Sequence, residues 1–287
     1  MIIVGYTGSS DSTRAVEYAA KLSWRIGTGL RIVHAFDMPT IDVPMGPEVI
    51  PPSKDEASDW YREVTDEATE VARRAGAQQV ETVVEVGPAH AALITNATED
   101  DLIVVGSRGR GEFASAFMGS VSYQVSAHAP CPVVVVTCHA DLDRNGPVVV
   151  GVDGSEPSQH AADLASDWAN HEGIDLVLVA AWQTQTLIGM AGGWAMPVMQ
   201  DATDQIEQGT VVMVDEVKSR LAERHPDLTV TATTVPGDPA AALVEASRDA
   251  SLLVVGSRGR GGFAGLLLGS ISHRVLHDAT VPVAVVR

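Results

Sequence analysis

Short apolar runs alternate with longer amphipathic stretches, and the whole alternation occurs twice along the chain. Several runs, such as LIVV at 102–105 and PVVVV at 132–136, are apolar at every position. Runs of this kind are typical of strands buried on both faces of a parallel sheet. Strands are therefore predicted at 2–5, 30–36, 80–86, 102–106 and 132–137, and again at 148–152, 174–181, 228–235, 252–256 and 281–286.

The stretches between these runs have helical spacing. Ala15, Ala19 and Leu22 share one face, and Ser53 precedes an acidic turn as a candidate N-cap. Because strand–helix alternation with right-handed crossovers builds a doubly wound sheet, each half is predicted as an α/β domain with an open five-stranded parallel sheet. Helices are predicted at 10–27, 54–75, 88–98 and 120–128, and at 156–172, 200–224, 238–249 and 270–278.

The two halves are copies of one unit. Residues 104–136 align with 254–286 without gaps, and more than half of the positions are identical. Residues 2–12 likewise match 148–158. We therefore predict two tandem domains, 1–138 and 147–287, with a short polar linker at about 139–146.

Composition narrows the class of protein. The chain of 287 residues is 45% apolar and 20% charged, which argues against disorder. Its 19 basic and 37 acidic residues give a net charge of −18, so neither nucleic acid nor an anionic membrane is an expected partner. Cys131 and Cys138 are expected to be free thiols. Without a membrane-length apolar run or a signal-peptide pattern, a cytoplasmic protein is expected.

A glycine-rich segment follows the fourth predicted strand of each half. Gly106-Ser107-Arg108-Gly109 precedes Gly119-Ser120 by nine residues, and Gly256-Ser257-Arg258-Gly259 precedes Gly269-Ser270 by the same interval. Open parallel sheets bind ligands at this edge. Glycines allow positive φ and close backbone approach to an anion. The following helix N-terminus adds unpaired N–H groups, so the pair is predicted to bind a di- or triphosphate.

Arginines support this interpretation, since Arg108, Arg110, Arg258 and Arg260 stand in these segments with only Glu112 against them. The alternative is that the glycines only form tight turns and the arginines are solvated. The repetition of the same spacing favours phosphate. The segments contain neither the P-loop nor the dinucleotide G-x-G-x-x-G fingerprint.

The spacing G-x2-G-x9-G-S on an α/β unit of this size resembles the ATP-binding branch of the universal stress proteins. The resemblance covers nearly the whole chain twice, as in tandem-domain members. It implies two Rossmann-like (adenine nucleotide α-hydrolase-like) domains, with ATP lying across the first and fourth strands of each. It also implies a pseudo-dimer of the two halves that docks through their last strands; a further homodimer of chains is left open.

The resemblance also assigns roles by motif position. The phosphates would meet the later glycines and the serines, the ribose would lie near Gly106 and Gly256, and adenine would lie against Ala35 and Ala181. The turn after the first strand would hold the adenosine end. The implied contacts are Thr7, Ala35, Gly106, Gly109, Gly119, Ser120, Val121 and Ser122 in the first half, and Asp153, Ala181, Gly256, Gly259, Gly269, Ser270, Ile271 and Ser272 in the second.

The first half departs from this pattern at Thr7, where the family usually has an aspartate and the second half has Asp153. Loss of a charged acceptor for the ribose predicts a weaker first site, although removal of an anion would also lessen repulsion of the phosphates. No protein-built metal site is expected, and Mg²⁺ would arrive with the nucleotide. His34 is expected to be structural.

Three functions stay open at this point. The chain is first of all expected to be a regulatory or signalling ATP-binding protein of the stress response, with an unidentified protein partner. The alternatives are a slow ATPase or phosphotransferase, for which the glycine-rich segments supply no repeated base, and an interaction scaffold with vestigial nucleotide binding. The segments 37–52 and 183–200 are lids or partner surfaces, or else packed loops or a domain–domain contact.

Overall fold

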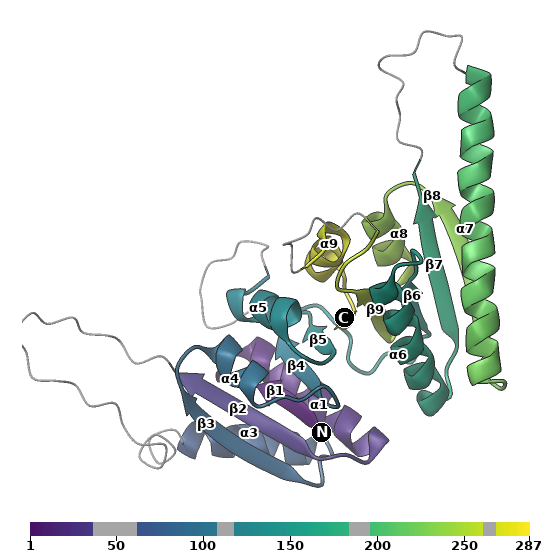
Figure 1. Ribbon diagram of the computed structural model, residues 1–287. Helices are drawn as coiled ribbons and strands as arrows, with labels where there is room; N and C mark the ends of the chain where they lie inside the picture. The colour runs from purple at the N-terminus through teal and green to yellow at the C-terminus, as the bar shows by residue number, and fades with distance from the viewer. Residues whose placement is uncertain (37–61, 108–117, 184–195, 261–267) are drawn as a thin grey trace, which may run out of the picture. The chain divides into compact units, whose positions relative to one another are not determined.

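The chain forms two compact units, Met1–Ala140 and Asp141–Arg287. The computed structural model describes residues 1–36, 62–107, 118–183, 196–260 and 268–287, with only the backbone of 196–202 (Figure 1). Each unit is an α/β domain with five parallel strands among these residues, so the predicted fold class is confirmed.

The first unit contains strands and helices close to the predicted ranges, except that residues 54–61 of the predicted helix 54–75 lie outside the described residues. The strands are β1 (Ile2–Gly5), β2 (Leu30–Phe36), β3 (Val80–Val86), β4 (Leu102–Gly106) and β5 (Val133–Val136). The helices are α1 (Ser10–Ile26), α3 (Arg62–Arg74), α4 (Ala89–Thr95) and α5 (Ser120–His128).

The second unit repeats this order. Its strands are β6 (Val148–Gly151), β7 (Leu176–Trp182), β8 (Val230–Pro236), β9 (Leu252–Gly256) and β10 (Val283–Val286). Its helices are α6 (Glu156–Glu172), α7 (Met196–Arg224), α8 (Pro239–Ala246) and α9 (Ser270–Asp278). Helix α7 begins earlier than predicted, so the end of the segment predicted as the loop 183–200 is helical.

The strand order, which the sequence did not determine, is β3-β2-β1-β4-β5 in the first unit and β8-β7-β6-β9-β10 in the second. The first strand of each unit therefore lies between the second and the fourth, for example with Val4 beside both Ile32 and Val104. The chain direction across the sheet reverses at this point. Open parallel sheets bind ligands outside the carboxyl ends of the strands at such a reversal.

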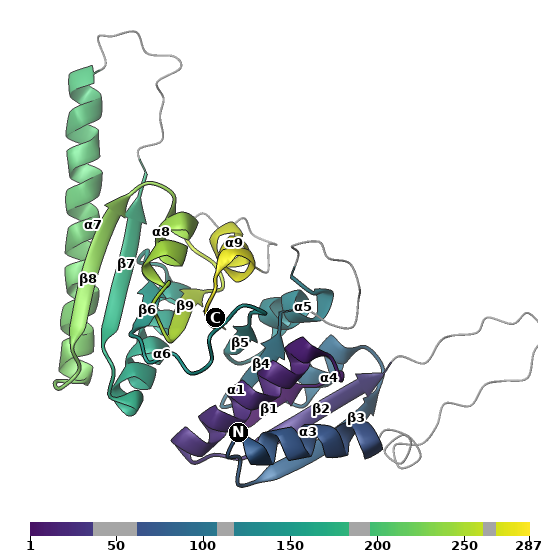
Figure 2. The ribbon, with the colours of Figure 1, turned by 180° about the vertical axis from the view of Figure 1, so that it is seen from behind.

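Helices cover both faces of each sheet (Figures 1 and 2). In the first unit α1 packs with α3 and α4 packs with α5, and the second unit pairs α6 with α7 and α8 with α9. Right-handed crossovers require this division, because the chain runs one way across the sheet through the first three strands and then returns. The central strands are buried on both faces, as the continuous apolar runs predicted.

The first helix of each unit is delimited by the same signals. Ser9 accepts a hydrogen bond from the Ser12 amide at the start of α1, and Ser155 caps α6 in the same way. Gly27 and Gly173 end these helices with φ of 67° and 65°, a left-handed conformation that favours glycine. The predicted cap Ser53 lies outside the described residues. No helix in the described part of the chain has the length and apolarity needed to cross a membrane.

Candidate functional site

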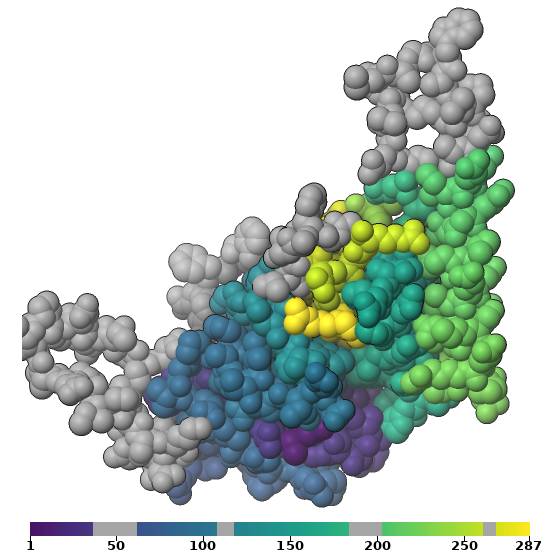
Figure 3. Space-filling model, viewed as in Figure 1, coloured from purple at the N-terminus to yellow at the C-terminus, as the bar shows by residue number. Residues whose placement is uncertain are grey.

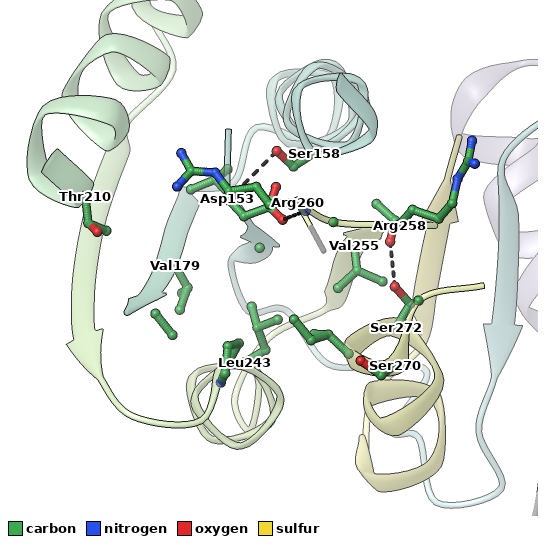
Figure 4. Close-up of a pocket in the computed structure, with 18 of the residues that line it drawn as sticks. Asp153, Ser158, Val179, Thr210, Leu243, Val255, Arg258, Arg260, Ser270 and Ser272 are labelled. Atoms are coloured by element: carbon green, nitrogen blue, oxygen red, sulfur yellow. Dashed lines mark hydrogen bonds between the residues drawn. The ribbon is translucent and has the colours of Figure 1, made fainter. Parts of the chain in front are cut away.

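A cavity of about 510 Å³ opens at the carboxyl edge of the second sheet (Figure 4). All eight contacts predicted in the second half line it, so the structure brings together residues from three strands and from α9. Its volume is within the range of about 300–1,000 Å³ that is usual for small-molecule sites. The lining residues are Gly151, Val152, Asp153, Ser158, Val179, Ala181, Thr210, Met213, Pro239, Leu243, Val255, Gly256, Arg258, Gly259, Arg260, Gly269, Ser270, Ile271 and Ser272.

One side of the cavity lining is mainly apolar and the other side is polar. Val179 and Leu243 lie on the side where β7, α7 and α8 meet, whereas Ser270 and Arg258 lie on the side of α9 (Figure 4). The cavity therefore offers an apolar surface that suits a flat ring system and a polar surface that suits an anion. Figure 3 shows the outer surface of the chain in the orientation of Figure 1.

The N-terminus of α9 faces this cavity without a side-chain cap. Gly269 occupies the N-cap position and has no side chain to accept a hydrogen bond from the first turn, whereas the Asp238 side chain caps α8. Helix starts normally satisfy these amides through a Ser, Thr, Asp or Asn side chain. The amides of Ser270 and Ile271 therefore stay available to an external acceptor, and the helix dipole favours an anion there.

The described glycines of both motifs are needed because neighbouring atoms lie close to them, and not because their φ is positive. The expectation of positive φ is therefore wrong for these glycines. A Cβ on Gly259 would lie 2.5 Å from Asp153 Oδ2, and one on Gly256 would lie 2.9 Å from the Pro157 carbonyl carbon. A Cβ on Gly269 would lie 3.3 Å from the Ser257 carbonyl oxygen. Their φ values all lie outside the left-handed region. Instead Gly154, in the turn after β6, has φ of 79°.

Both carboxylate oxygens of Asp153 accept hydrogen bonds. Its Oδ1 accepts from the Ser155 hydroxyl at 2.6 Å and from the Ser155 amide at 3.0 Å, and its Oδ2 accepts from the Arg260 amide at 3.1 Å. Burial acts to raise the pKa of this carboxyl, but the hydrogen bonds from Ser155, Ser158 and Arg260 outweigh it and hold the pKa below its usual value. The carboxylate is therefore ionised at neutral pH.

Two of the serines predicted to meet phosphate have a structural bond in this state. The Ser272 hydroxyl donates to the Gly256 carbonyl at 2.6 Å, and the Ser122 hydroxyl donates to Gly106 at the same distance. Each bond ties a helix start to the end of the preceding strand. The hydroxyl protons are thus already donated, and what these positions offer an anion without rotation is the backbone amide.

The first unit assembles the corresponding elements differently. The Thr7 hydroxyl lies 3.0 Å from Ser9 Oγ and 3.3 Å from Ser12 Oγ, all within one turn. Helix α5 also begins at an N-cap glycine, Gly119, with no side-chain cap. Ala35 lies in β2, and Gly106 ends β4. Ser120 and Val121 open α5. Gly109, Arg108, Arg110 and Glu112 lie outside the described residues.

Comparison with known proteins settles the family. The sequence model described as the Universal stress protein family matches residues 1–137 and 145–287. The chain belongs to the universal stress protein family. The universal stress protein Rv2623 of Mycobacterium tuberculosis strain H37Rv is 34% identical over 296 residues, which cover 100% of this chain and 96% of that protein. Rv2005c of the same strain is also 34% identical, over 302 residues with the same coverage.

Solved structures of universal stress proteins share this fold. A universal stress protein from Archaeoglobus fulgidus DSM 4304 aligns with a TM-score of 0.67 at 22% identity, covering 100% of this chain and 95% of that one. A functionally unknown protein from Pseudomonas aeruginosa PAO1 aligns with a TM-score of 0.64 at 16% identity, covering 99% and 91%. At these identities the likeness concerns the fold alone.

Sequence reasoning missed the part of the universal stress protein cavity that α7 and α8 supply. Thr210 and Met213 come from α7, and Pro239 and Leu243 from α8. The Thr210 hydroxyl donates to the Ile206 carbonyl at 2.8 Å, so toward a ligand its oxygen is an acceptor. No local signal marks these residues. They reach the site because the strand order, which the sequence did not determine, places these helices beside it.

The remaining candidates have no site chemistry in the structure. His34 is buried, and its Nδ1 lies 2.9 Å from the Tyr6 carbonyl oxygen, a structural contact. Cys131 and Cys138 are free, and burial raises the pKa of the Cys131 thiol to about 11. Within the described ranges no three His, Cys, Asp or Glu side chains gather as metal ligands.

Proposed function

We propose that this universal stress protein binds ATP at the carboxyl edge of each sheet, and that occupancy of the two sites governs a regulatory or signalling role in the stress response. One observation carries the proposal. Every residue that the motif implies in the second half lines one cavity, and that cavity faces a helix N-terminus without a side-chain cap.

The residues of the second half fit the parts of the nucleotide. The triphosphate would lie at the amides of Ser270 and Ile271. The Arg260 guanidinium lies on the opposite side, beside Gly154 and Met213. The ribose would donate a hydroxyl to Asp153. Adenine would lie against the apolar side chains of β7, α7 and α8. Since no side-chain cluster in the described cavity offers several carboxylates, Mg²⁺ would be held by phosphate oxygens and water.

Binding fits this cavity better than turnover does. Asp153 is the sole carboxylate among the described residues that line it, and both of its oxygens already accept hydrogen bonds. Its pKa is held low by those bonds, which makes it a weak proton acceptor. Phosphoryl transfer needs a positioned base or an equivalent group to orient the nucleophile. A regulatory site is therefore the function we propose.

The direct test is the nucleotide content and affinity of the full chain. Freshly purified protein is denatured, and any released nucleotide is identified by chromatography and mass spectrometry with its stoichiometry per chain. Calorimetry with ATP and GTP, each with Mg²⁺, then measures affinity. We expect adenine nucleotide in the released material and tighter binding of ATP than of GTP. Protein that carries no nucleotide and shows no heat with millimolar ATP would refute the proposal.

A further inference from the structure

A negative charge stands beside the turn that is proposed to hold phosphate. The 257–260 turn (Ser257-Arg258-Gly259-Arg260) passes so close to Asp153 that a Cβ on Gly259 would lie 2.5 Å from Oδ2. Electrostatics alone makes this an unfavourable neighbour for a polyphosphate. The proposed contact with the ribose accounts for a carboxylate at this position. It does not account for the hydrogen bond that Asp153 accepts from the Arg260 amide of the turn.

The carboxylate joins two segments that are far apart in the sequence. Oδ1 is held from its own side, by the hydroxyl and the amide of Ser155 at 2.6 and 3.0 Å. Oδ2 reaches across to the Arg260 amide at 3.1 Å (Figure 4). Ser155 also caps α6, so the carboxylate is fixed to the start of a helix. A rigidly held acceptor of this kind restrains the backbone that donates to it.

We infer that Asp153 anchors the 257–260 turn in its anion-binding conformation before the nucleotide arrives, and so acts as a positioning residue for the phosphates as well as an acceptor for the ribose. The inference rests on the proposed nucleotide site. It assigns to Asp153 an effect on ligands that it does not touch, namely a gain in phosphate affinity that comes from a preformed turn.

The hydrogen bonds of Asp153 allow the carboxylate both to hold the turn and to accept from a ribose hydroxyl. A carboxylate oxygen accepts about two hydrogen bonds. Among the hydrogen bonds of the described residues, the Ser155 hydroxyl and amide donate to Oδ1 and the Arg260 amide donates to Oδ2, while Ser158 also contributes to holding the pKa of the carboxyl low. One direction on Oδ2 therefore stays available for a ribose hydroxyl. Because the same oxygen would receive the ribose and hold the turn, the two ends of the nucleotide site are coupled through one atom.

Inorganic tripolyphosphate separates the two roles, because it has phosphates and no ribose. If Asp153 served the ribose alone, Asp153→Ala would leave tripolyphosphate affinity unchanged or raise it, since a negative charge is removed. If Asp153 anchors the turn, the same variant weakens tripolyphosphate binding by about two- to tenfold, the range expected for one lost hydrogen bond. Only the anchoring role therefore predicts a loss of tripolyphosphate affinity in Asp153→Ala.

Trypsin cleavage after Arg258 reads this turn by itself, since the Arg258 side chain is exposed. Full-length protein is digested briefly with and without tripolyphosphate, and the Arg258–Gly259 cleavage is quantified by mass spectrometry. We expect Asp153→Ala to be cut roughly tenfold faster there without ligand. We also expect a higher tripolyphosphate concentration for half-maximal protection. Asp153→Asn, which keeps one acceptor oxygen, is expected between the two.

Asp175→Ala is the matched control. Asp175 is an exposed carboxylate directly before β7, at the opposite end of that strand from the cavity, so the variant removes the same charge away from the turn. Its cleavage rate after Arg258 is expected to equal that of the wild type. Circular dichroism and urea unfolding show that each variant is folded. If Asp153→Ala does not fold, Asp153→Asn gives the same comparison.

The outcomes distinguish this inference from the proposed function. Unchanged cleavage after Arg258 in both Asp153 variants, with unchanged or tighter tripolyphosphate protection, overturns the anchoring role even where the wild type binds ATP. A wild type that binds neither ATP nor tripolyphosphate overturns the proposed function. In that event, faster cleavage after Arg258 in the Asp153 variants than in the wild type still supports restraint of the turn by Asp153. Equal cleavage in the variants and the wild type still refutes it.

Discussion

The two halves of the chain share strand order, helix caps and glycine spacing, yet they hold the turn after their first strand in different ways. In the second half a carboxylate spans from Ser155 to Arg260, whereas in the first half the Thr7 hydroxyl contacts serines of its own turn. Duplication has thus preserved the signals that build the fold. The two halves differ at Thr7 and Asp153, and therefore in the hydrogen-bond acceptor that this turn presents.

Exchanging that side chain should have the largest effect. Asp153→Thr gives the second half the residue of the first, and removes the carboxylate that is proposed to accept from the ribose together with its bond from the Arg260 amide. We expect ATP affinity at the second site to fall about ten- to a hundredfold, since hydrogen bonds to charged groups contribute about 1.5–3 kcal/mol. Two-site calorimetry measures it. Equal affinity of the variant and the wild type would mean that Asp153 takes no part in binding.

A methyl group at Gly259 tests the same contact without a change of charge. In Gly259→Ala the new Cβ would lie 2.5 Å from Asp153 Oδ2, so the turn and the carboxylate must separate. ATP affinity at the second site should fall about tenfold. Gly209→Ala, in α7 with nothing within 4 Å of the added atom, is the control. It should leave ATP binding unchanged and stabilise the helix by about 0.5–1 kcal/mol.

The reciprocal exchange, Thr7→Asp, should narrow the difference between the halves. The new carboxylate can accept from Ser9, as Asp153 does from Ser155, and so offer a charged acceptor to the ribose. We expect first-site affinity to rise about three- to tenfold, because repulsion of the phosphates offsets part of the gain. Calorimetry in an Asp153→Thr background isolates that site. A loss of affinity would show that repulsion dominates.

The carboxylate also makes the stability of the second half depend on pH. The pKa of Asp153 lies below its ordinary value of 3.8, so its ionised form stabilises the fold at higher pH. This contribution is complete above the ordinary value and is lost as the pH falls through the lowered one. Urea unfolding should therefore show a gap between the wild type and Asp153→Asn that is constant from pH 7 to about 5 and narrows below about 4. A gap independent of pH would contradict this.

The smallest difference concerns an ion pair on the surface. Arg274 contacts Asp238 at 2.6 Å and joins α9 to the cap of α8, whereas the first half has Gln124 and Pro88 at the corresponding positions. Both side chains are about half exposed. Arg274→Gln should therefore lower the free energy of unfolding by less than about 1 kcal/mol, measured by urea denaturation. A larger loss would mean that this pair is essential to the second half.

The sequence was sufficient for features that repeat locally. Unbroken apolar runs such as Val133–Val136 predicted buried strands, because short runs rich in β-branched residues are typical of strands covered on both faces. The spacing from Gly256 to Gly269 predicted one wall of the cavity, because residues at a strand end and at the next helix start meet at the sheet edge. These inferences needed no knowledge of strand order.

The rest required three-dimensional contacts. Met213 and Leu243 reach the cavity through the packing of α7 and α8, and nothing in their local sequence marks them. The sequence predicted positive φ at Gly259, but the structure shows that a glycine is needed there because of Asp153, which lies more than a hundred residues earlier. The Ser272 hydroxyl, expected to face phosphate, donates instead to the Gly256 carbonyl at the end of β9, a contact that sequence spacing does not reveal.

The bare first turns of α5 and α9 have a thermodynamic consequence. A glycine N-cap in place of Ser, Thr, Asp or Asn forgoes roughly a few tenths of a kcal/mol of folding free energy per helix, and an anion bound at those amides would offset this loss. The melting temperature of the chain then rises with the concentration of whatever anion binds there. If ATP binds there, as proposed, a higher ATP concentration would make the protein more resistant to unfolding and would lengthen its lifetime among proteases.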